Sequence, residues 1–377
     1  MSILDLIPNH IRALGLYVPG KLIRQAEHES GVAMIKMASN ENPLGPSPLA
    51  LEAMRRAAAE VNLYPDMDAT ELRLALAARH NLKPGQILIA DGSTPLLHFL
   101  ASVFLRSGLH CISSERSFII YPIAVGSAGG EYITLPTRND GCDLDAIASA
   151  ITDKTRLVIL ANPNNPTGTM FDAEATEAFL RRVPEHVLVI LDEAYSDFAD
   201  YFAAARGINW SRSFDYVRAG RLNLVVLRTF SKIYGLAGVR LGYACGHPEL
   251  LQHLARVRSS FSVSALAEAA GVAAIRDKDH VRQTLENNAV GAEWLMERFA
   301  EMEIRALPTT TNFIYFEIKG DANEVSKRMQ EEGVIVRPLA PWGIPNAIRV
   351  TIGTPQQNET FMQVLKKVLS SLLIAAR

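Results

Sequence analysis

The sequence predicts an α/β protein built on a mostly parallel sheet with helices on both faces. From about residue 86, short apolar runs rich in β-branched residues alternate with longer stretches of helical periodicity. The runs are apolar at successive positions, a pattern typical of strands that are buried on both faces of a sheet. Together the two observations favour a parallel sheet enclosed between helices.

Each element of this sheet follows from its local pattern. Four apolar runs predict strands at 87–90, 157–160, 187–191 and 224–227. Helical patterns lie between them at 96–106, 143–151 and 173–182. We therefore expect residues 86–245 to form one α/β domain.

The C-terminal third predicts a second, smaller α+β domain. A helical passage from about 247 to 300 precedes strand-like runs at 313–316, 334–337 and 348–351, and a final helix begins at about 355. The first 40 residues have weak periodicity and several prolines and glycines, which indicates an arm. The expected division is an arm at 1–45 that packs with the small domain, a large domain at 46–260 and a small domain at 261–377.

The composition excludes several classes of function. The 377 residues include 38 Lys and Arg against 40 Asp and Glu, so the net charge of −2 gives no overall attraction to nucleic acid or an anionic membrane. The three cysteines lack the spacing of a metal site or a disulfide framework. His247 and His253 are six residues apart and would not share a helix face, so we expect no bound metal. The N-terminus lacks the features of a secretory signal, and no apolar run reaches membrane-spanning length. We therefore expect a cytoplasmic protein.

Polar residues gather where the predicted strands end. Segment 91–95 follows the first strand and opens a helix, where backbone N–H groups bind phosphate, although an ordinary helix cap explains the segment as well. Segment 162–168 repeats Asn-Pro directly after the second strand, and Asp192 and Tyr195 follow the third. Parallel strands bring their carboxyl ends to one edge of the sheet, so we expect a polar site there.

The lysine that follows the fourth strand lies close in sequence to two hydroxyl side chains and an arginine. Thr229, Ser231 and Lys232 lie together at the end of this strand, and Arg240 comes eight residues after the lysine. A lone lysine after a strand is usually solvated, but this one shares the sheet edge with Asp192. Burial and a neighbouring cation lower the pKa of a lysine from about 10.4 and make its amine nucleophilic. We therefore expect Lys232 to serve an anionic cofactor.

Pyridoxal phosphate catalysis needs all of these groups at once. A lysine forms a Schiff base with the cofactor, and a carboxylate keeps the pyridine nitrogen protonated. Hydroxyls, backbone amides and an arginine hold the phosphate. In this interpretation Lys232 is the nucleophile and Asp192 is the carboxylate.

These residues resemble those of the fold-type I pyridoxal-phosphate aminotransferases, and among them the histidinol-phosphate aminotransferases. The resemblance covers nearly the whole chain and is carried by segments 17–21, 39–46, 162–168, 192–195, 229–240 and 349–354. It implies the fold-type I architecture, pyridoxal 5'-phosphate as the cofactor, and a homodimer whose active sites are shared between the subunits.

The resemblance also implies roles for individual residues at the cofactor. Lys232 is similar to the Schiff-base lysine, and Asp192 to the partner of the pyridinium nitrogen. Asn165 and Tyr195 match residues that bond the ring hydroxyl oxygen, and Tyr64 matches a tyrosine that reaches the cofactor phosphate across the dimer interface. The residues that match the phosphate-binding cup are Ser93, Thr94, Thr229, Ser231 and Arg240.

Further matches concern the ring and the substrate. The family usually has tyrosine where this chain has Phe118, and phenylalanine still stacks on the pyridine ring through its face. Arg349 resembles the arginine that grips the substrate carboxylate and, in histidinol-phosphate enzymes, faces the substrate phosphate. Arg337, Tyr17 and Asn42 match further contacts in the substrate pocket. A strand end facing water explains Arg337 equally well, and simple packing of the arm explains Tyr17.

The function implied by the resemblance is transamination of L-histidinol phosphate with 2-oxoglutarate, giving imidazole acetol phosphate and glutamate in histidine biosynthesis. An aromatic amino acid aminotransferase shares every cofactor residue, so the residues alone do not separate the two. A phosphothreonine decarboxylase of the same fold also places arginines near a phosphate. A non-catalytic regulatory module that binds the cofactor is the alternative from another class. In each case the expected partners are small molecules and a second copy of the chain, with neither nucleic acid nor membrane.

Overall fold

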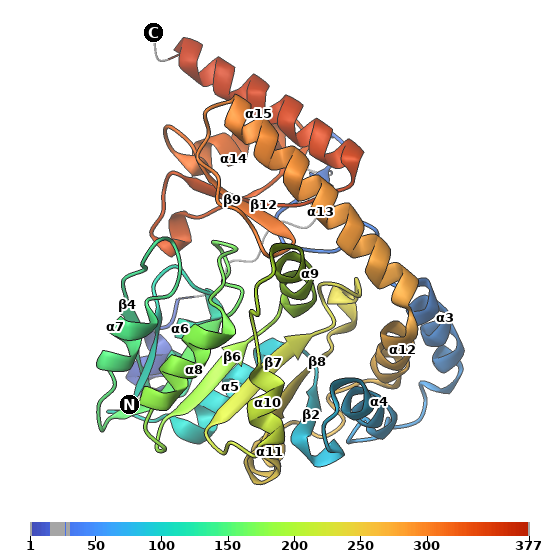
Figure 1. Ribbon diagram of the computed structural model, residues 1–377, viewed down its shortest axis with the longest axis vertical. Helices are drawn as coiled ribbons and strands as arrows, with labels where there is room; N and C mark the ends of the chain where they lie inside the picture. Colours follow the sequence, from blue (N-terminus) through green and yellow to red (C-terminus); the bar gives the residue numbers. More distant parts are fainter. Residues whose placement is uncertain (1, 16–26, 28–30, 376–377) are drawn as a thin grey trace.

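A sheet of seven strands forms the centre of the computed structural model, which describes residues 2–15, 27 and 31–375 (Figure 1). The order of the strands is β2 (Ile87–Ala90), β8 (Gly242–Gly246), β7 (Leu224–Thr229), β6 (Leu188–Asp192), β5 (Thr155–Ala161), β3 (His110–Ser114) and β4 (Glu131–Leu135). Strand β8 runs antiparallel to both of its neighbours, and the other pairs are parallel. The predicted mostly parallel sheet is thus confirmed.

Helices cover both faces of this sheet, as the continuous apolar runs predict. Within β6, Leu188 and Ile190 belong to the apolar core on one face, and Val189 and Leu191 to the core on the other. The first face packs against α5 (Ser93–Phe104), α6 (Ile120–Ser127) and α11 (Pro248–Ala255). The second packs against α7 (Leu144–Ser149), α8 (Ala173–Arg182) and α10 (Ser213–Arg218). The strands therefore hold their polar ends at fixed places on the sheet edge.

A smaller antiparallel sheet lies beyond one end of the seven-stranded sheet (Figure 1). Its strands are, in order, β11 (Arg337–Pro338), β12 (Ala347–Thr351) and β9 (Phe313–Glu317). A short parallel pair, β1 (Ile35–Lys36) with β10 (Val334–Ile335), ties the N-terminal part of the chain to this region. The surrounding helices are α13 (Lys278–Glu301), α14 (Ala322–Glu331) and α15 (Pro355–Ala375), which share an apolar core with the sheet.

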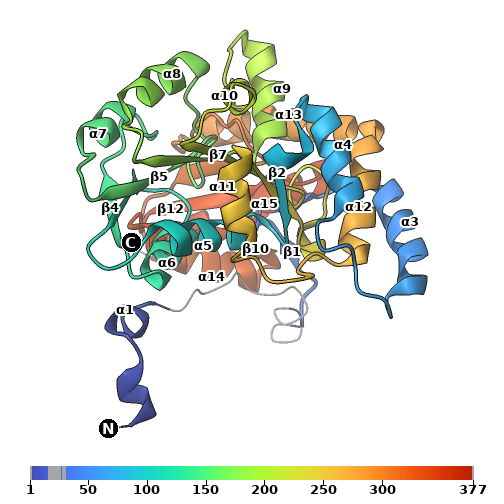
Figure 2. The same ribbon diagram turned by 90° about the horizontal axis from the view of Figure 1, so that it is seen from below.

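The remaining elements connect these two parts or lie outside them. They are η1 (Ile3–Leu6), α1 (Asn9–Arg12), α3 (Pro48–Ala57), η2 (Ala58–Glu60), α4 (Thr70–His80), η3 (Pro84–Gln86), α9 (Ser196–Arg206), η4 (Ala237–Val239), α12 (Ala265–Arg276) and η5 (Ala340–Trp342). Helix α12 packs against α3 and α4, and α1 contacts α6, whereas the N-terminal segment with η1 projects from the main body (Figure 2). Over the described residues, every helix is too short or too polar to cross a membrane.

The structure differs from the prediction at several elements. Strands β3, β4 and β8 were not predicted, because two of them carry polar residues and β8 begins and ends with glycine. The helical passage from 247 to 300 is three helices, since Ser264 caps the start of α12 and Asp277 caps the start of α13. The run 334–337 divides between β10 and β11, which pair with different strands.

Candidate active site

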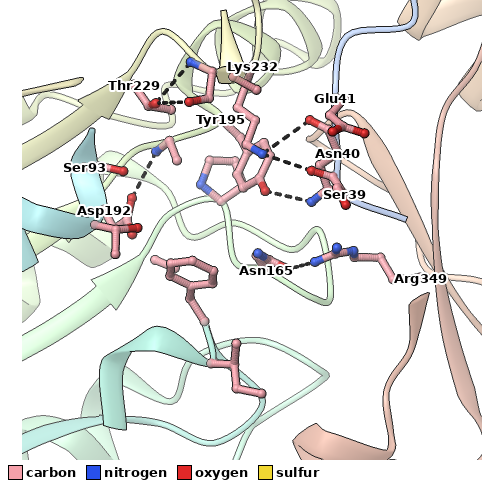
Figure 3. A pocket seen from close by; sticks show the side chains of 18 of the residues that line it. Ser39, Asn40, Glu41, Ser93, Asn165, Asp192, Tyr195, Thr229, Lys232 and Arg349 are labelled. Carbon is pink, nitrogen blue, oxygen red and sulfur yellow. Dashed lines mark hydrogen bonds between the residues drawn. The ribbon is translucent and has the colours of Figure 1, made fainter. Parts of the chain in front are cut away.

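A cavity of about 280 Å³ lies at the edge of the seven-stranded sheet that faces the smaller sheet (Figure 3). Strands β5, β6 and β7 are adjacent and parallel, so their carboxyl ends meet at this edge. The predicted site residues that line the cavity are Ser93, Thr94, Phe118, Asn165, Asp192, Tyr195, Thr229, Ser231, Lys232, Arg240, Arg337 and Arg349. The fold thus brings together residues that are more than 250 positions apart in the sequence.

Lys232 reaches into the cavity from the loop after β7. Its Nζ atom donates to the backbone carbonyls of Ser39 and Asn40, both at 3.3 Å (Figure 3). Burial, together with the nearby charge of Arg349, lowers the pKa of Lys232 to about 8. A large fraction of this amine is therefore neutral, and hence nucleophilic, near pH 8.

Asp192 ends strand β6 and is 5% exposed. Its Oδ2 atom accepts a hydrogen bond of 2.8 Å from the hydroxyl of Tyr121, and its Oδ1 atom accepts one of 3.3 Å from the backbone N–H of Ala194. Burial raises the pKa of Asp192 to about 6, although both hydrogen bonds oppose the rise. The carboxyl group is therefore mostly ionised at neutral pH and has room to accept a further donor.

Tyr195 lies beyond Asp192 and is fixed by contacts from two distant segments. Its hydroxyl accepts a hydrogen bond of 2.8 Å from Nδ2 of Asn40, and its ring meets the ring of Phe313 edge-on at 5.2 Å. Burial raises the pKa of Tyr195 to about 12, so the phenol stays protonated at neutral pH. The phenol is thus a donor that can bond an anionic oxygen in the cavity.

Two glycines make room for a close approach between the start of α5 and the loop after β7. A Cβ atom on Gly92, whose φ is +125°, would lie 2.6 Å from Nη2 of Arg240. A Cβ on Gly242 would lie 2.6 Å from the backbone nitrogen of Ser93. The start of α5, where backbone N–H groups lack partners within the helix, therefore lies close to the guanidinium of Arg240, a combination found in sites that bind phosphate.

Hydroxyl groups complete this corner of the cavity. The side chain of Thr229 donates to Oγ of Ser231 at 3.0 Å and accepts from the backbone N–H of Ser231 at 3.1 Å. The corner thus combines helix N–H groups, two hydroxyls and a guanidinium, which are the groups that bind a phosphate ester.

Arg349 approaches the cavity from strand β12 of the smaller sheet. Its Nη1 atom donates to Oδ1 of Asn165 (Figure 3). Its Nη2 atom donates to the carbonyl of Ala38 at 2.8 Å. The side chain is 6% exposed. A guanidinium fixed at this depth can bind an anionic group of a ligand through its planar set of donors.

Three predicted residues are not part of the cavity wall that the structure describes. Tyr64 is 84% exposed, and its ring packs at a tilt against the ring of Phe261 with centroids 4.8 Å apart. Asn42 is buried, and its Nδ2 atom donates to the carbonyl of Ile233 at 2.9 Å and to Oγ1 of Thr284 at 3.1 Å. Tyr17 lies outside the described residues.

Sequence reasoning missed several residues that line the cavity. Tyr121 follows Phe118 by one helical turn, and Asn40 belongs to the segment 39–46 that carries the resemblance, so both had a signal nearby. Trp342 also lines the cavity, but nothing in its local sequence pattern marks it. No group of three or more His, Cys, Asp or Glu within the described part of the chain is arranged to hold a metal ion.

The chemistry of the cavity is that of an amine beside an anion-binding corner. A lysine that is partly neutral near pH 8 attacks carbonyl groups, and a buried carboxylate stabilises a positive charge opposite it. With a mostly parallel sheet that carries these groups at one edge, the site and the fold define a fold-type I transferase.

Comparisons with known proteins narrow this class. The family described as "Aminotransferase class I and II" matches residues 32–365. The histidinol-phosphate aminotransferase of Moorella thermoacetica is 44% identical over 94% of this chain and 90% of the relative, and "Histidinol-phosphate aminotransferase 2" of Pseudomonas aeruginosa is 43% identical over 96% of each. The crystal structure of the histidinol-phosphate aminotransferase from Sinorhizobium meliloti, in complex with pyridoxal-5'-phosphate, has a TM-score of 0.88 and 28% identity over 98% of both chains. The chain belongs to the class I and II aminotransferases and, within them, to the histidinol-phosphate aminotransferase family.

Proposed function

We propose that the chain transfers the amino group of L-histidinol phosphate to 2-oxoglutarate, giving imidazole acetol phosphate and glutamate in histidine biosynthesis. The observation that carries this proposal is the 43–44% identity to relatives of that name along nearly their whole length. The site supports it, since two arginines, Arg337 and Arg349, enter the same cavity as Lys232. Both the donor and the product glutamate carry anionic groups that guanidinium groups bind.

Pyridoxal 5'-phosphate is the proposed cofactor, because the residues of the cavity fit it. When bound, it forms an imine with a primary amine and draws electrons from the bonds at the α-carbon of that amine. The glycines at positions 92 and 242 allow Arg240 and the start of α5 to approach closely, which brings together the donors proposed for its phosphate. The residues proposed to hold the phosphate are Ser93, Thr94, Thr229, Ser231 and Arg240.

The ring of the cofactor has proposed partners on its other sides. Phe118, Asn165 and Tyr195 line the cavity; Phe118 would pack against the ring, and Asn165 and Tyr195 would hydrogen-bond its oxygen. The carboxylate of Asp192 would accept a hydrogen bond from the ring nitrogen and keep it protonated. With a pKa of about 6, Asp192 carries the negative charge that this role needs at neutral pH.

Lys232 has two proposed roles. Its Nζ atom would hold the cofactor through the imine that the cofactor forms with a primary amine. With the cofactor bound, the free amine of Lys232 would accept the proton from the α-carbon of the substrate and donate it again as a general base and acid. The carbonyls of Ser39 and Asn40, 3.3 Å from Nζ, hold the free lysine close to its working position.

The two arginines have separate proposed tasks in the substrate pocket. Arg349, held by Asn165 and the carbonyl of Ala38, binds the carboxylate of glutamate or 2-oxoglutarate. Arg337 binds the anion at the far end of the substrate, which is the phosphate of histidinol phosphate. Tyr17 and Asn42 are proposed as additional contacts on that side.

A homodimer with shared active sites is part of the proposal. Tyr64 is 84% exposed, and Val61 and Leu63 beside it are each 62% exposed. Exposed apolar side chains that lie together mark a surface for another protein, and a second copy is the proposed occupant. In such a dimer Tyr64 would complete the phosphate site of the partner subunit.

We also propose a cytoplasmic location and a division of the chain into three parts. All three cysteines, Cys111, Cys142 and Cys245, are free thiols, which supports a reducing, cytoplasmic location. The division at 1–45, 46–260 and 261–377 is supported by the sheets, because the seven-stranded sheet falls within the second part and the three-stranded sheet within the third.

Half-reactions of the holoenzyme test the proposed donor. The enzyme is mixed separately with histidinol phosphate, phenylalanine, tyrosine and glutamate, and the loss of the Schiff-base absorbance is followed. We expect histidinol phosphate to react faster than either aromatic amino acid. Faster reaction with phenylalanine identifies an aromatic aminotransferase instead, and carbon dioxide release from phosphothreonine identifies a decarboxylase.

Chemical trapping tests the proposed role of the lysine. Reduction with borohydride followed by peptide mapping is expected to place the cofactor label on Lys232, and Lys232→Ala is expected to abolish steady turnover. A label elsewhere, or near-normal turnover in this variant, contradicts the role. Absence of amine transfer from every donor, with the label on Lys232, supports the regulatory module.

A further inference from the structure

Arg337 and Arg349 occupy directly opposed positions in the smaller sheet. They are register partners on the antiparallel strands β11 and β12, and both line the cavity. Like charges in this arrangement repel each other, so each guanidinium needs an anchor of its own to keep its direction. Asn165 and the carbonyl of Ala38 anchor Arg349.

Trp342 provides such an anchor for Arg337. The guanidinium carbon of Arg337 lies 5.2 Å from the centroid of the Trp342 ring, within the range of a cation–π interaction. Trp342 is itself fixed, because its Nε1 atom donates to the carbonyl of Ser117 at 2.8 Å. Its ring also packs against the apolar cluster that includes Leu339 and Ile344.

The contact with Ser117 joins two parts of the cavity wall. Trp342 belongs to the connection between β11 and β12, whereas Ser117 directly precedes Phe118 in the connection between β3 and α6. The indole therefore has a defined place relative to the residue that faces the cofactor ring. Through this indole, the direction of Arg337 is fixed relative to the reacting end of the pocket.

We propose that Trp342 is a positioning residue that sets the specificity of this site for substrates with a distal anion. It acts through Arg337, the arginine proposed to bind the phosphate of histidinol phosphate and, by the same chemistry, the γ-carboxylate of glutamate. The inference rests on the proposed function for the roles of the cavity and extends it to a residue with no assigned role. A substrate with a neutral far end gains nothing from this arrangement.

Matched pairs of donors separate this role from a general structural one. Histidinol phosphate is compared with histidinol, and glutamate with glutamine, because the members of each pair differ in the charge at the far end. The half-reaction of each donor is measured with the holoenzymes of the wild type, Trp342→Leu and Trp342→Phe. Trp294→Leu is the matched control, because Trp294 carries Arg298 over its ring at 5.6 Å on helix α13, away from the cavity.

We expect Trp342→Leu to reduce kcat/KM for the charged member of each pair by roughly 5- to 20-fold, as loss of a partly buried cation–π contact predicts. The change should appear in KM, with the uncharged member nearly unaffected. Trp342→Phe keeps a ring face but loses the bond to Ser117. Its kcat/KM for the charged donors should therefore lie between the values of the wild type and Trp342→Leu. Trp294→Leu should leave the ratio of kcat/KM between the charged and the uncharged donor unchanged in both pairs.

A double-mutant cycle tests whether the effect passes through Arg337. In an Arg337→Gln background, Trp342→Leu should have no further effect on the charged donors. The inference is overturned if Trp342→Leu lowers kcat/KM equally for charged and uncharged donors. It is also overturned if the losses caused by Trp342→Leu and Arg337→Gln are fully additive. If the wild type fails to convert histidinol phosphate, the proposed function fails alone, because the glutamate and glutamine pair still tests Trp342.

Discussion

The hydroxyl of Tyr121 donates a hydrogen bond of 2.8 Å to Oδ2 of Asp192 from within the core of the protein. Tyr121 is fully buried and Asp192 is 5% exposed, so neither group exchanges this bond for one with bulk water. Burial raises the pKa of Asp192, whereas this hydrogen bond lowers it. Tyr121 thus helps to keep a carboxylate ionised at a depth where a carboxyl group would otherwise be neutral.

The substitution Tyr121→Phe should therefore weaken the enzyme without unfolding it. A hydrogen bond to a charged group is worth about 1.5–3 kcal/mol, so we expect the pKa of Asp192 to rise by roughly one to two units and kcat/KM at pH 7 to fall by roughly two- to tenfold. The acidic limb of the pH profile should move to higher pH, and the apoprotein should bind pyridoxal phosphate more weakly.

Tyr243→Phe is the control for this experiment. Tyr243 is also a buried tyrosine, and its hydroxyl bonds Nε2 of His80 at 2.9 Å, but it does not line the cavity. Its replacement should affect stability without moving the pH profile. An unchanged acidic limb in Tyr121→Phe would show that Tyr121 does not control the charge of Asp192.

Lys232 should make the stability of the apoprotein depend on pH. Burial lowers its pKa from an ordinary 10.5 to about 8, so between these values the unfolded chain binds more protons than the folded one. Stability therefore rises with pH through this window, and the cost of the buried charge is fully present below pH 8.

The isosteric substitution Lys232→Met removes that cost. Thermal unfolding of the apoproteins should give Lys232→Met a midpoint a few degrees above that of the wild type at pH 7, and the gap should shrink as the pH approaches 10. Loss of the bonds to the carbonyls of Ser39 and Asn40 offsets part of the gain at every pH. A gap that is constant between pH 7 and pH 10 would contradict the lowered pKa of Lys232.

The sequence predicted the residues that stand directly at strand ends. Asp192 and Thr229 end strands whose apolar runs are unmistakable, and the parallel sheet then brings them to one edge. The loop of Asn165 follows the same rule. For such residues the local pattern locates the strand end, and the parallel topology then places that end at the site.

The residues that the sequence did not predict depend on contacts between distant parts of the chain. Asn40 bonds Tyr195 only because the segment after β1 crosses the edge of the large sheet, and Trp342 bonds Ser117 across the two sheets. Neither contact leaves a trace in local periodicity or composition. Pairings of this kind are decided by tertiary packing, which the printed sequence encodes only as a whole.

Gly235 should be essential for the position of the segment that faces Lys232. Its φ is +67°, and a Cβ atom there would lie 2.1 Å from the carbonyl oxygen of Gly45 and 2.8 Å from the Cα atom of Pro46. The clash involves backbone atoms, which cannot rotate away. We expect Gly235→Ala to lower the free energy of unfolding by roughly 3 kcal/mol or more and to reduce kcat/KM, since the displaced segment also carries Asn40.

Gly238→Ala is the matched control from the same loop. A Cβ atom on Gly238 meets nothing within 4 Å. Denaturant unfolding and steady-state kinetics of the two variants should therefore differ sharply, with Gly238→Ala close to the wild type. Equal stability of the two variants would show that the segment around Gly45 adapts to the added methyl group.

Shared active sites should allow two inactive variants to restore each other. If Tyr64 serves the partner subunit, a heterodimer of Tyr64→Ala and Lys232→Ala has one site with both lesions and one site with none. Random pairing of equal amounts should then recover about a quarter of the wild-type activity, although each variant alone is nearly inactive. Tyr201→Ala mixed with Lys232→Ala is the control, because Tyr201 is a surface tyrosine on α9 that is 38% exposed. The mixture of Tyr64→Ala and Lys232→Ala could instead have only the average activity of the two separate variants. That result would mean that each subunit builds its site alone and that Tyr64 does not serve the partner subunit.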